Sequence, residues 1–148
     1  MLREPFIHSL VESFPLADFK FFDEANRIAS LPMPNGHGEL SIHDDGDELT
    51  FFLGDITHCH FSQDYLGDGK YSPEAETIED AVDYLRDLFS DQVVFYRARN
   101  GGRDGSIQCP SEEKLSRVLA DCNCFVWSAS IEPNTEQDED GKTSPAIS

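Results

Sequence analysis

Residues 38–43 and 48–53 each place their large apolar side chains at every second position. This spacing is typical of a strand that is buried on one face. The intervening residues 44–47 have the sequence Asp-Asp-Gly-Asp, a composition that favours a tight turn. The pattern therefore predicts a β-hairpin. A further strand is expected over residues 56–61, after a bend at Gly54.

Three other stretches repeat their apolar residues every three or four positions, as amphipathic helices do. They cover residues 6–14, 77–89 and 111–122. Thr77 and Ser111 are the predicted N-caps of the second and third helices, because a hydroxyl group there can accept a hydrogen bond from a free backbone N–H. In the first helix, the predicted apolar face consists of Ile7, Leu10, Val11 and Phe14.

The order of strands and helices predicts an α+β fold rather than an alternating α/β fold. Further strands are expected at 92–99, 106–109 and 124–131, and residues 18–31 admit one or two more. We therefore expect one domain over residues 1–131, with a mostly antiparallel sheet and two or three helices packed on it. Residues 132–148 contain many polar residues, Pro and Gly, and one large apolar residue, so they are predicted to form an acidic flexible tail.

Charge restricts the classes of function. The chain contains 11 Lys and Arg against 29 Asp and Glu, for a net charge of −18. Nucleic acids and anionic membranes repel so acidic a protein, and neither is an expected partner.

The start of the chain has no apolar stretch of signal-peptide length. The protein is therefore expected to be cytoplasmic, with its four cysteines reduced and with Cys122 and Cys124 buried at a helix-to-strand junction.

The acidic residues are concentrated within residues 44–91, which contain fourteen acids and two bases. A surface of this kind can steer a basic protein partner and accelerate its association. The alternative is that the charge only keeps the protein soluble. Under the first hypothesis, the partner-binding residues lie on the predicted hairpin and on the second helix: Asp44, Asp45, Asp47, Glu48, Glu79, Asp80, Asp83 and Asp87.

The His-Cys-His stretch at residues 58–60 is the strongest candidate for metal chemistry. Alternate residues of a strand share a face, so His58 and His60 are expected to point the same way. A zinc site needs three or four ligands, which His43 and Asp55 could complete. The alternative is two histidines on a half-exposed strand. Cys59 is expected on the opposite face, where it cannot pair with His58 as a nucleophile. No catalytic motif or cofactor is predicted, so the chain is not expected to be an enzyme; the alternative is a small metal-binding protein or metal-dependent enzyme that uses His58 and His60.

Four aromatic residues could supply an exposed anchor for a protein interface, where aromatic side chains often dominate binding. The alternative for each is a place in the core. They are Phe52, Tyr84, Tyr96 and Trp127.

The order of patterns over residues 38–130 resembles the small acidic α/β immunity proteins of bacterial toxin systems. The resemblance begins with the segment GELSIHDDGDELTFFLGDITHCHF at residues 38–61. It continues through an acidic helix (TIEDAVDYLRDLF), a strand (VVFYRAR), a Gly-rich tip (NGGRDG) and a closing strand (CFVWSAS). The resemblance implies a non-catalytic inhibitor that binds and blocks a cognate toxin, often a nuclease. It assigns no individual binding residue.

Overall fold

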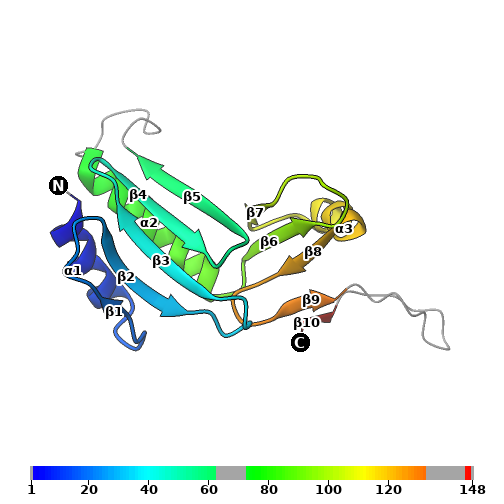
Figure 1. Cartoon of the computed structure of the whole chain (residues 1–148), viewed down its shortest axis with the longest axis horizontal. Helices are drawn as coiled ribbons and strands as arrows, with labels where there is room; N and C mark the ends of the chain where they lie inside the picture. The colour runs from blue at the N-terminus through cyan, green and yellow to red at the C-terminus, as the bar shows by residue number, and fades with distance from the viewer. Residues whose placement is uncertain (1, 63–72, 133–145, 148) are drawn as a thin grey trace.

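Two antiparallel sheets and three helices make up the part of the chain that the structure, a computed structural model, describes: residues 2–62, 73–132 and 146–147. The predicted α+β class is therefore confirmed, although the strands form two sheets rather than one (Figure 1). Residues 63–72 and most of the predicted tail lie outside the described residues.

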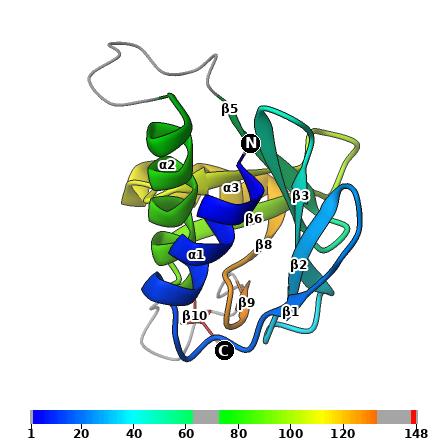
Figure 2. The same cartoon turned by 90° about the vertical axis from the view of Figure 1, so that its left-hand side faces the viewer.

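The N-terminal sheet contains five strands in sequence order. They are β1 (Lys20–Phe21), β2 (Arg27–Pro32), β3 (Glu39–Asp44), β4 (Glu48–Leu53) and β5 (Thr57–Ser62). Helices α1 (Arg3–Ser13) and α2 (Pro73–Phe89) both lie on one side of this sheet, as Figure 2 shows. The opposite face of the sheet, which we call its outer face, is covered by none of the helices in the described residues (Figures 1 and 2).

The predicted hairpin is confirmed, and its register explains the core beneath it. Leu40 pairs with Leu53, and Ile42 pairs with Phe51. All four side chains are fully buried. Because side chains of paired residues point to the same face, the hairpin delivers a continuous apolar surface to α1 and α2.

The C-terminal sheet has the strand order β10-β9-β8-β6-β7. Its strands are β6 (Val93–Ala98), β7 (Gly105–Gln108), β8 (Cys122–Phe125), β9 (Ser130–Glu132) and β10 (Ala146–Ile147), and α3 (Glu112–Asp121) precedes β8. The single strand predicted over residues 124–131 is wrong. Val126 and Ala129 exchange backbone hydrogen bonds of 2.8 and 3.3 Å, which closes a turn between β8 and β9.

Strands β6 and β8 contribute buried side chains to two apolar clusters, one on each face. Phe95 and Phe125 belong to the main core, together with the side chains of α1, α2 and the N-terminal sheet. Val94 and Cys124 belong to a second cluster that includes Leu119 of α3. Since neighbouring residues of a strand point in opposite directions, these two strands separate the two clusters.

The apolar face predicted for the first helix is rotated relative to the real one. Leu2, Phe6 and Leu10 are fully buried, whereas Val11 is 54% exposed. These three residues follow a four-residue spacing along one side of the helix, and α1 begins earlier than predicted, at Arg3. Leu10 of the predicted face is buried, and Ile7 and Phe14 pack against the main core, so the prediction was wrong at Val11 and missed Leu2 and Phe6.

Helix α2 begins four residues before the predicted N-cap. Pro73 is its first residue, a position that tolerates proline because the N–H there has no helical partner. Thr77 is consequently inside the helix, where its hydroxyl group donates a 2.8 Å hydrogen bond to the carbonyl oxygen of Pro73. No helix in the described residues is long and apolar enough to cross a bilayer.

Polar and ring contacts help to fasten the two sheets together. In the loop between β2 and β3, the side-chain amide of Asn35 donates to the carbonyl oxygen of Val126 at 2.9 Å. The His37 ring lies 4.0 Å from the Phe125 ring, measured between centroids. Between the sheets, Arg97 of β6 forms a 2.6 Å ion pair with Asp55.

Candidate functional site

The four acids of the predicted hairpin have different roles. Asp44 is buried and accepts a hydrogen bond from the backbone N–H of Gly46 at 2.9 Å. Asp45 accepts a 2.8 Å hydrogen bond from the Thr50 hydroxyl group. These two carboxylates stabilise the turn. Asp44 therefore cannot belong to an exposed binding surface, as the sequence had suggested.

The other two hairpin acids are accessible to different extents. Asp47 is exposed at the tip of the turn. Glu48 is half-buried, and its Oε2 atom lies 3.4 Å from Nδ1 of His60. Asp47 is thus the member of the hairpin set that is best placed to meet a partner.

The acids of α2 are more exposed than those of the hairpin. Glu79, Asp80 and Asp83 are exposed, and Asp87 is half-buried. Asp83 pairs with Arg86 at 2.8 Å, and Asp87 accepts a 2.6 Å hydrogen bond from the side chain of Gln108. In the described part of the chain, neither Glu79 nor Asp80 has an ion-pair partner.

The hairpin and helix acids do not form the single patch that the sequence predicted. Helix α2 lies on the opposite side of the main core from the outer face of the N-terminal sheet (Figure 2). The exposed carboxylates of α2 point away from that core, whereas the hairpin turn belongs to the sheet layer. The predicted set therefore divides into two separate groups.

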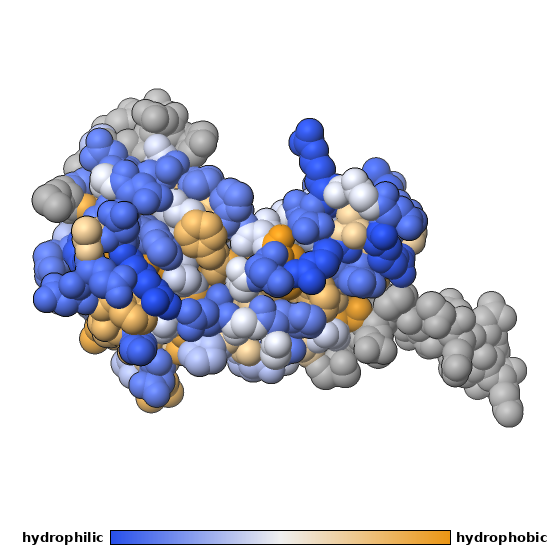
Figure 3. Space-filling model, in the orientation of Figure 1, coloured by the Kyte–Doolittle hydropathy of each residue, from blue (hydrophilic) through white to orange (hydrophobic). Residues whose placement is uncertain are grey.

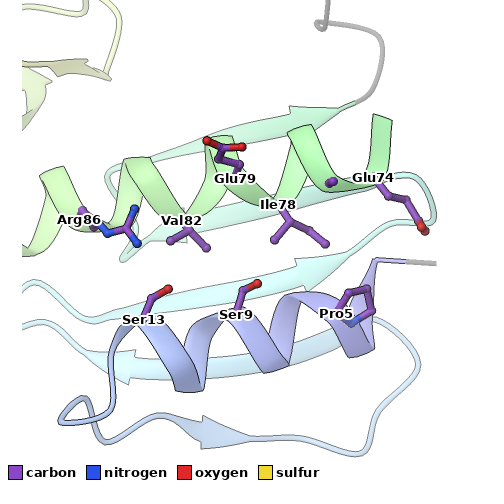
Figure 4. Close-up of a pocket in the computed structure, with 9 residues that line it drawn as sticks. Pro5, Ser9, Ser13, Glu74, Ile78, Glu79, Val82 and Arg86 are labelled. Carbon is purple, nitrogen blue, oxygen red and sulfur yellow. The ribbon is translucent and has the colours of Figure 1, made fainter. Parts of the chain in front are cut away.

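A groove of about 530 Å³ runs between α1 and α2 beside the helix acids. Ile78 and Val82 point from α2 toward α1, and Ser9 and Ser13 point from α1 toward α2 (Figure 4). Glu79 also lines the groove. We call this hollow the α1–α2 groove. It combines an apolar floor with hydroxyl groups, the exposed carboxylate of Glu79 and the side chain of Arg86, which is paired with Asp83. The end near Glu79 can hold the stem and the charged end of a basic side chain.

A row of aromatic and imidazole rings crosses the outer face of the N-terminal sheet. The rings of His43 and Phe52 are 4.9 Å apart, those of Phe52 and His58 5.8 Å, and those of His58 and His60 5.0 Å, measured between centroids. Phe52 is 39% exposed. Figure 3 shows that most of this side is hydrophilic, with small apolar areas among the polar residues.

Hydroxyl groups orient two of these imidazoles. Ser41 lies 2.9 Å from Nε2 of His43, and Thr50 lies 3.0 Å from Nδ1 of His60. Thr50 is almost completely buried and uses its one hydroxyl proton on Asp45. It must therefore accept a hydrogen bond from His60, which assigns a proton to Nδ1 of that ring.

The expected metal site is incomplete in the described residues. His58 and His60 share a face, as predicted, but Asp55 is occupied by Arg97 instead of joining them. The guanidinium group of Arg97 holds the pKa of Asp55 below its usual value, through a hydrogen bond and its charge. Within residues 2–62, 73–132 and 146–147, no three His, Cys, Asp or Glu side chains are placed to hold one ion.

The four cysteines are unpaired, and the structure separates them by environment. Cys59 points away from the histidines into the main core, where burial raises its pKa to about 12. Cys122 and Cys124 are buried beside α3, as predicted, and burial raises the pKa of Cys124 to about 11. Cys109 is exposed. A thiol is a poor nucleophile while it holds its proton, so Cys59 is not a catalytic candidate.

Sequence reasoning missed a second, apolar groove of about 490 Å³. It is lined by Trp127 together with side chains that follow α1 or lie at and after the end of β2: Phe14, Pro15, Leu16, Pro32 and Pro34. The feature of the sequence that pointed to this groove was the candidate anchor Trp127. The groove could not be predicted because its other lining residues come from three segments that are distant in the chain. Of the four candidate exposed anchors, Trp127 and Tyr84 are buried, Tyr96 is half-buried and Phe52 is partly exposed, so the hypothesis of an exposed Trp127 was wrong.

Comparison of the chain with protein-family models, curated proteins and solved structures gave no match.

Proposed function

We propose that this protein is a non-catalytic inhibitor of the immunity type, which docks and blocks a basic protein partner through the acidic surface of α2. One observation carries the proposal. Glu79, an exposed carboxylate without an ion-pair partner in the described residues, lines the α1–α2 groove, and Asp80, which is also exposed and has no such partner there, follows it on the same helix. A surface of this composition suits Lys or Arg side chains, whose stems are apolar and whose ends are charged.

The electrostatics of the helix support a role outside the folded chain. Glu79 and Asp83 are four residues apart, and so are Asp83 and Asp87. Like charges at this spacing destabilise a helix by about 0.2–0.5 kcal/mol per pair. Arg86 offsets only part of this repulsion, through Asp83. A cationic partner would relieve the remainder and would be attracted over a distance of about 10 Å at moderate salt.

We place the docking surface on α2 rather than on the hairpin because the hairpin acids are engaged internally. Asp44 and Asp45 accept hydrogen bonds that stabilise the turn, and Glu48 lies beside His60. Asp45 and Asp47 are both exposed, but the Asp45 carboxylate is engaged by the Thr50 hydroxyl group. The alternative function, metal binding by His58 and His60, would need its remaining ligands from outside the described residues.

The experiment that tests the proposal is co-expression with the product of a neighbouring coding region. An inhibitor of this type is expected to be encoded beside its target, so that product should arrest growth when it is expressed alone. Growth should recover when this chain is co-expressed. The double variant E79K/D80K should fail to restore growth, whereas E112K/E113K on α3, which changes the net charge equally, should restore it.

Two outcomes would contradict the proposal. A neighbouring product that is harmless would remove the target that the proposal requires. Equal protection by E79K/D80K and E112K/E113K would show that the acidity of α2 does not select the partner, and would favour a solubilising role for the charge.

A further inference from the structure

The apolar groove around Trp127 is open and strongly hydrophobic. Leu16 at its edge is 98% exposed. The rings of Phe14 and Phe89 are 5.1 Å apart, and those of Phe89 and Trp127 are 4.8 Å apart, so the wall is a continuous set of aromatic contacts. We call this hollow the Trp127 groove. Exposed apolar surface of this kind is typical of a binding site for another molecule.

The Trp127 groove continues the α1–α2 groove. Ser13 lines both hollows. On α2, the first groove extends to Arg86 and the second begins at Phe89, less than one helical turn further along. One surface therefore changes from acidic to apolar along the same pair of helices. Glu79 and Phe89 are ten positions apart on α2, which corresponds to about 15 Å along the helix axis.

We propose that the Trp127 groove holds an apolar or aromatic side chain of the basic partner, about 15 Å from the Lys or Arg residues that meet Glu79. This inference rests on the proposed function and specifies the partner: a cationic segment followed by an apolar anchor. The charge of this chain selects such an occupant over a second copy. Two copies would each carry −18 and would repel one another, whereas a cationic segment is attracted.

The acidic part of the surface and the Trp127 groove are expected to act on different steps of binding. The carboxylates attract the partner over a distance but lie exposed to water, where each ion pair contributes little to affinity. An aromatic side chain that enters a preformed apolar groove is removed from water and holds the complex together. We therefore expect the acidic part to control association and the Trp127 groove to control dissociation.

Trp127 is the only tryptophan in the chain, so its fluorescence reports directly on the groove. The probes are two synthetic peptides that lack Trp. Each has two lysines, a Gly-Ser-Gly spacer and a final residue that is Phe in one peptide and Ala in the other. An extended chain rises about 3.3 Å per residue, so the lysines and the final residue lie about 13–17 Å apart. Both peptides are titrated against the full chain.

The Phe peptide should bind at least about tenfold more tightly than the Ala peptide, because burial of one aromatic side chain is worth at least that factor. It should also change the Trp127 emission. The variant L16S should abolish this preference. The matched control V11S, which alters an exposed apolar residue that lines neither groove, should keep it. Neither variant should affect stability much, because both side chains are exposed.

The outcomes separate this inference from the proposed function. If both peptides bind equally, or if L16S and V11S behave alike, the anchor is absent and this inference is overturned. If E79Q/D80N weakens the Ala peptide no more than the distant control E113Q does, the acidic docking surface fails instead. Sedimentation that shows a dimer lost in L16S would assign the Trp127 groove to a second copy and would also overturn the inference.

Discussion

The surface of α2 and the outer face of the N-terminal sheet lie on opposite sides of one core, and both are polar. They differ in how their charges are satisfied. On the sheet side, Arg27 pairs with Glu39 at 2.7 Å, and Glu48 lies 3.4 Å from His60. On α2, Glu79 and Asp80 have no ion-pair partner among the described residues.

This difference shows why the amount of charge alone does not identify a binding surface. A carboxylate that already accepts a hydrogen bond from its own chain must give up that contact before it can meet a partner. A free carboxylate has no such contact to lose. The free carboxylates of α2 are therefore better candidates for a binding surface than the row of oriented imidazoles on the outer face. Changes on both surfaces test this difference.

The first change contrasts the two faces of β4. Phe51 is fully buried, and Phe52, its neighbour on the outer face, is 39% exposed. Truncation of a buried Phe leaves a cavity and costs about 3–5 kcal/mol, so Phe51→Ala should lower the free energy of unfolding by about that amount. Phe52→Ala should cost less than about 1 kcal/mol, since little burial is lost. Urea denaturation measures both. A large loss for Phe52→Ala would show that the outer face is not open.

The second test measures the reactivity of the Cys59 thiol, which lies beneath the outer face. Because burial raises the pKa of Cys59 to about 12, a thiol reagent should modify it far more slowly than exposed Cys109 at neutral pH. Mass spectrometry of the modified peptides measures the two rates. Equal rates would contradict the buried position of Cys59.

The same pKa predicts how stability changes in alkaline solution. The unfolded chain releases the Cys59 proton near its usual pKa of 9.0, while the folded chain keeps it up to about 12. Between these values the unfolded state binds fewer protons, so the free energy of unfolding should fall as the pH rises. The variant C59A should show a shallower decline, and an identical decline would contradict the assignment.

The third change compares charge reversal on the two surfaces. We expect E79K/D80K to weaken binding of the Ala-terminated cationic peptide by about tenfold or more. The matched variant E39K/D47K reverses two charges on the sheet side and should leave binding within about twofold. Isothermal titration at about 0.1 M and about 1 M salt measures both, because screening shortens from about 10 Å to about 3 Å. A larger effect of E39K/D47K would move the docking surface to the hairpin side.

The smallest expected effects have opposite signs. Glu79→Gln removes repulsion with Asp83 and should raise the free energy of unfolding by about 0.2–0.5 kcal/mol at low salt. Glu39→Gln removes the ion pair with Arg27 and should lower it by about 0.2–1 kcal/mol. Both effects should shrink at high salt in urea titrations. The same sign for both would show that the two surfaces do not differ in this way.

The spacing of apolar residues within short stretches of sequence predicted the hairpin and the helices. The alternating residues of the hairpin and the apolar stripe of α2 appear in the structure as predicted, with Ile78, Leu85 and Leu88 buried. Ser111 caps α3 and accepts a 3.2 Å hydrogen bond from the N–H of Lys114, as its position before two glutamates indicated. These features depend on residues close together in the chain.

The parts that the sequence did not predict depend on distant contacts. The division into two sheets arises because β6 pairs with β8 across an intervening helix, and no periodicity records such a choice. The Trp127 groove likewise joins Phe14, Pro34 and Trp127 from segments far apart in the chain. Asp44 is buried, and its carboxylate accepts a hydrogen bond from the backbone N–H of Gly46. The residue type alone did not distinguish this role in the turn from a place on the binding surface. Whether the α2 acids bind a partner stays a prediction.

The double-sided burial of β6 and β8 has a consequence for how the protein denatures. Phe95 faces one apolar cluster and Val94 the other, so both clusters share strand β6 as a wall. Unfolding of either cluster would therefore expose the strand that covers the other. Asn35 and Arg97 add bonds across the same junction. The chain should therefore denature in one cooperative calorimetric transition, and the amide protons of β6 should be among the slowest to exchange with solvent.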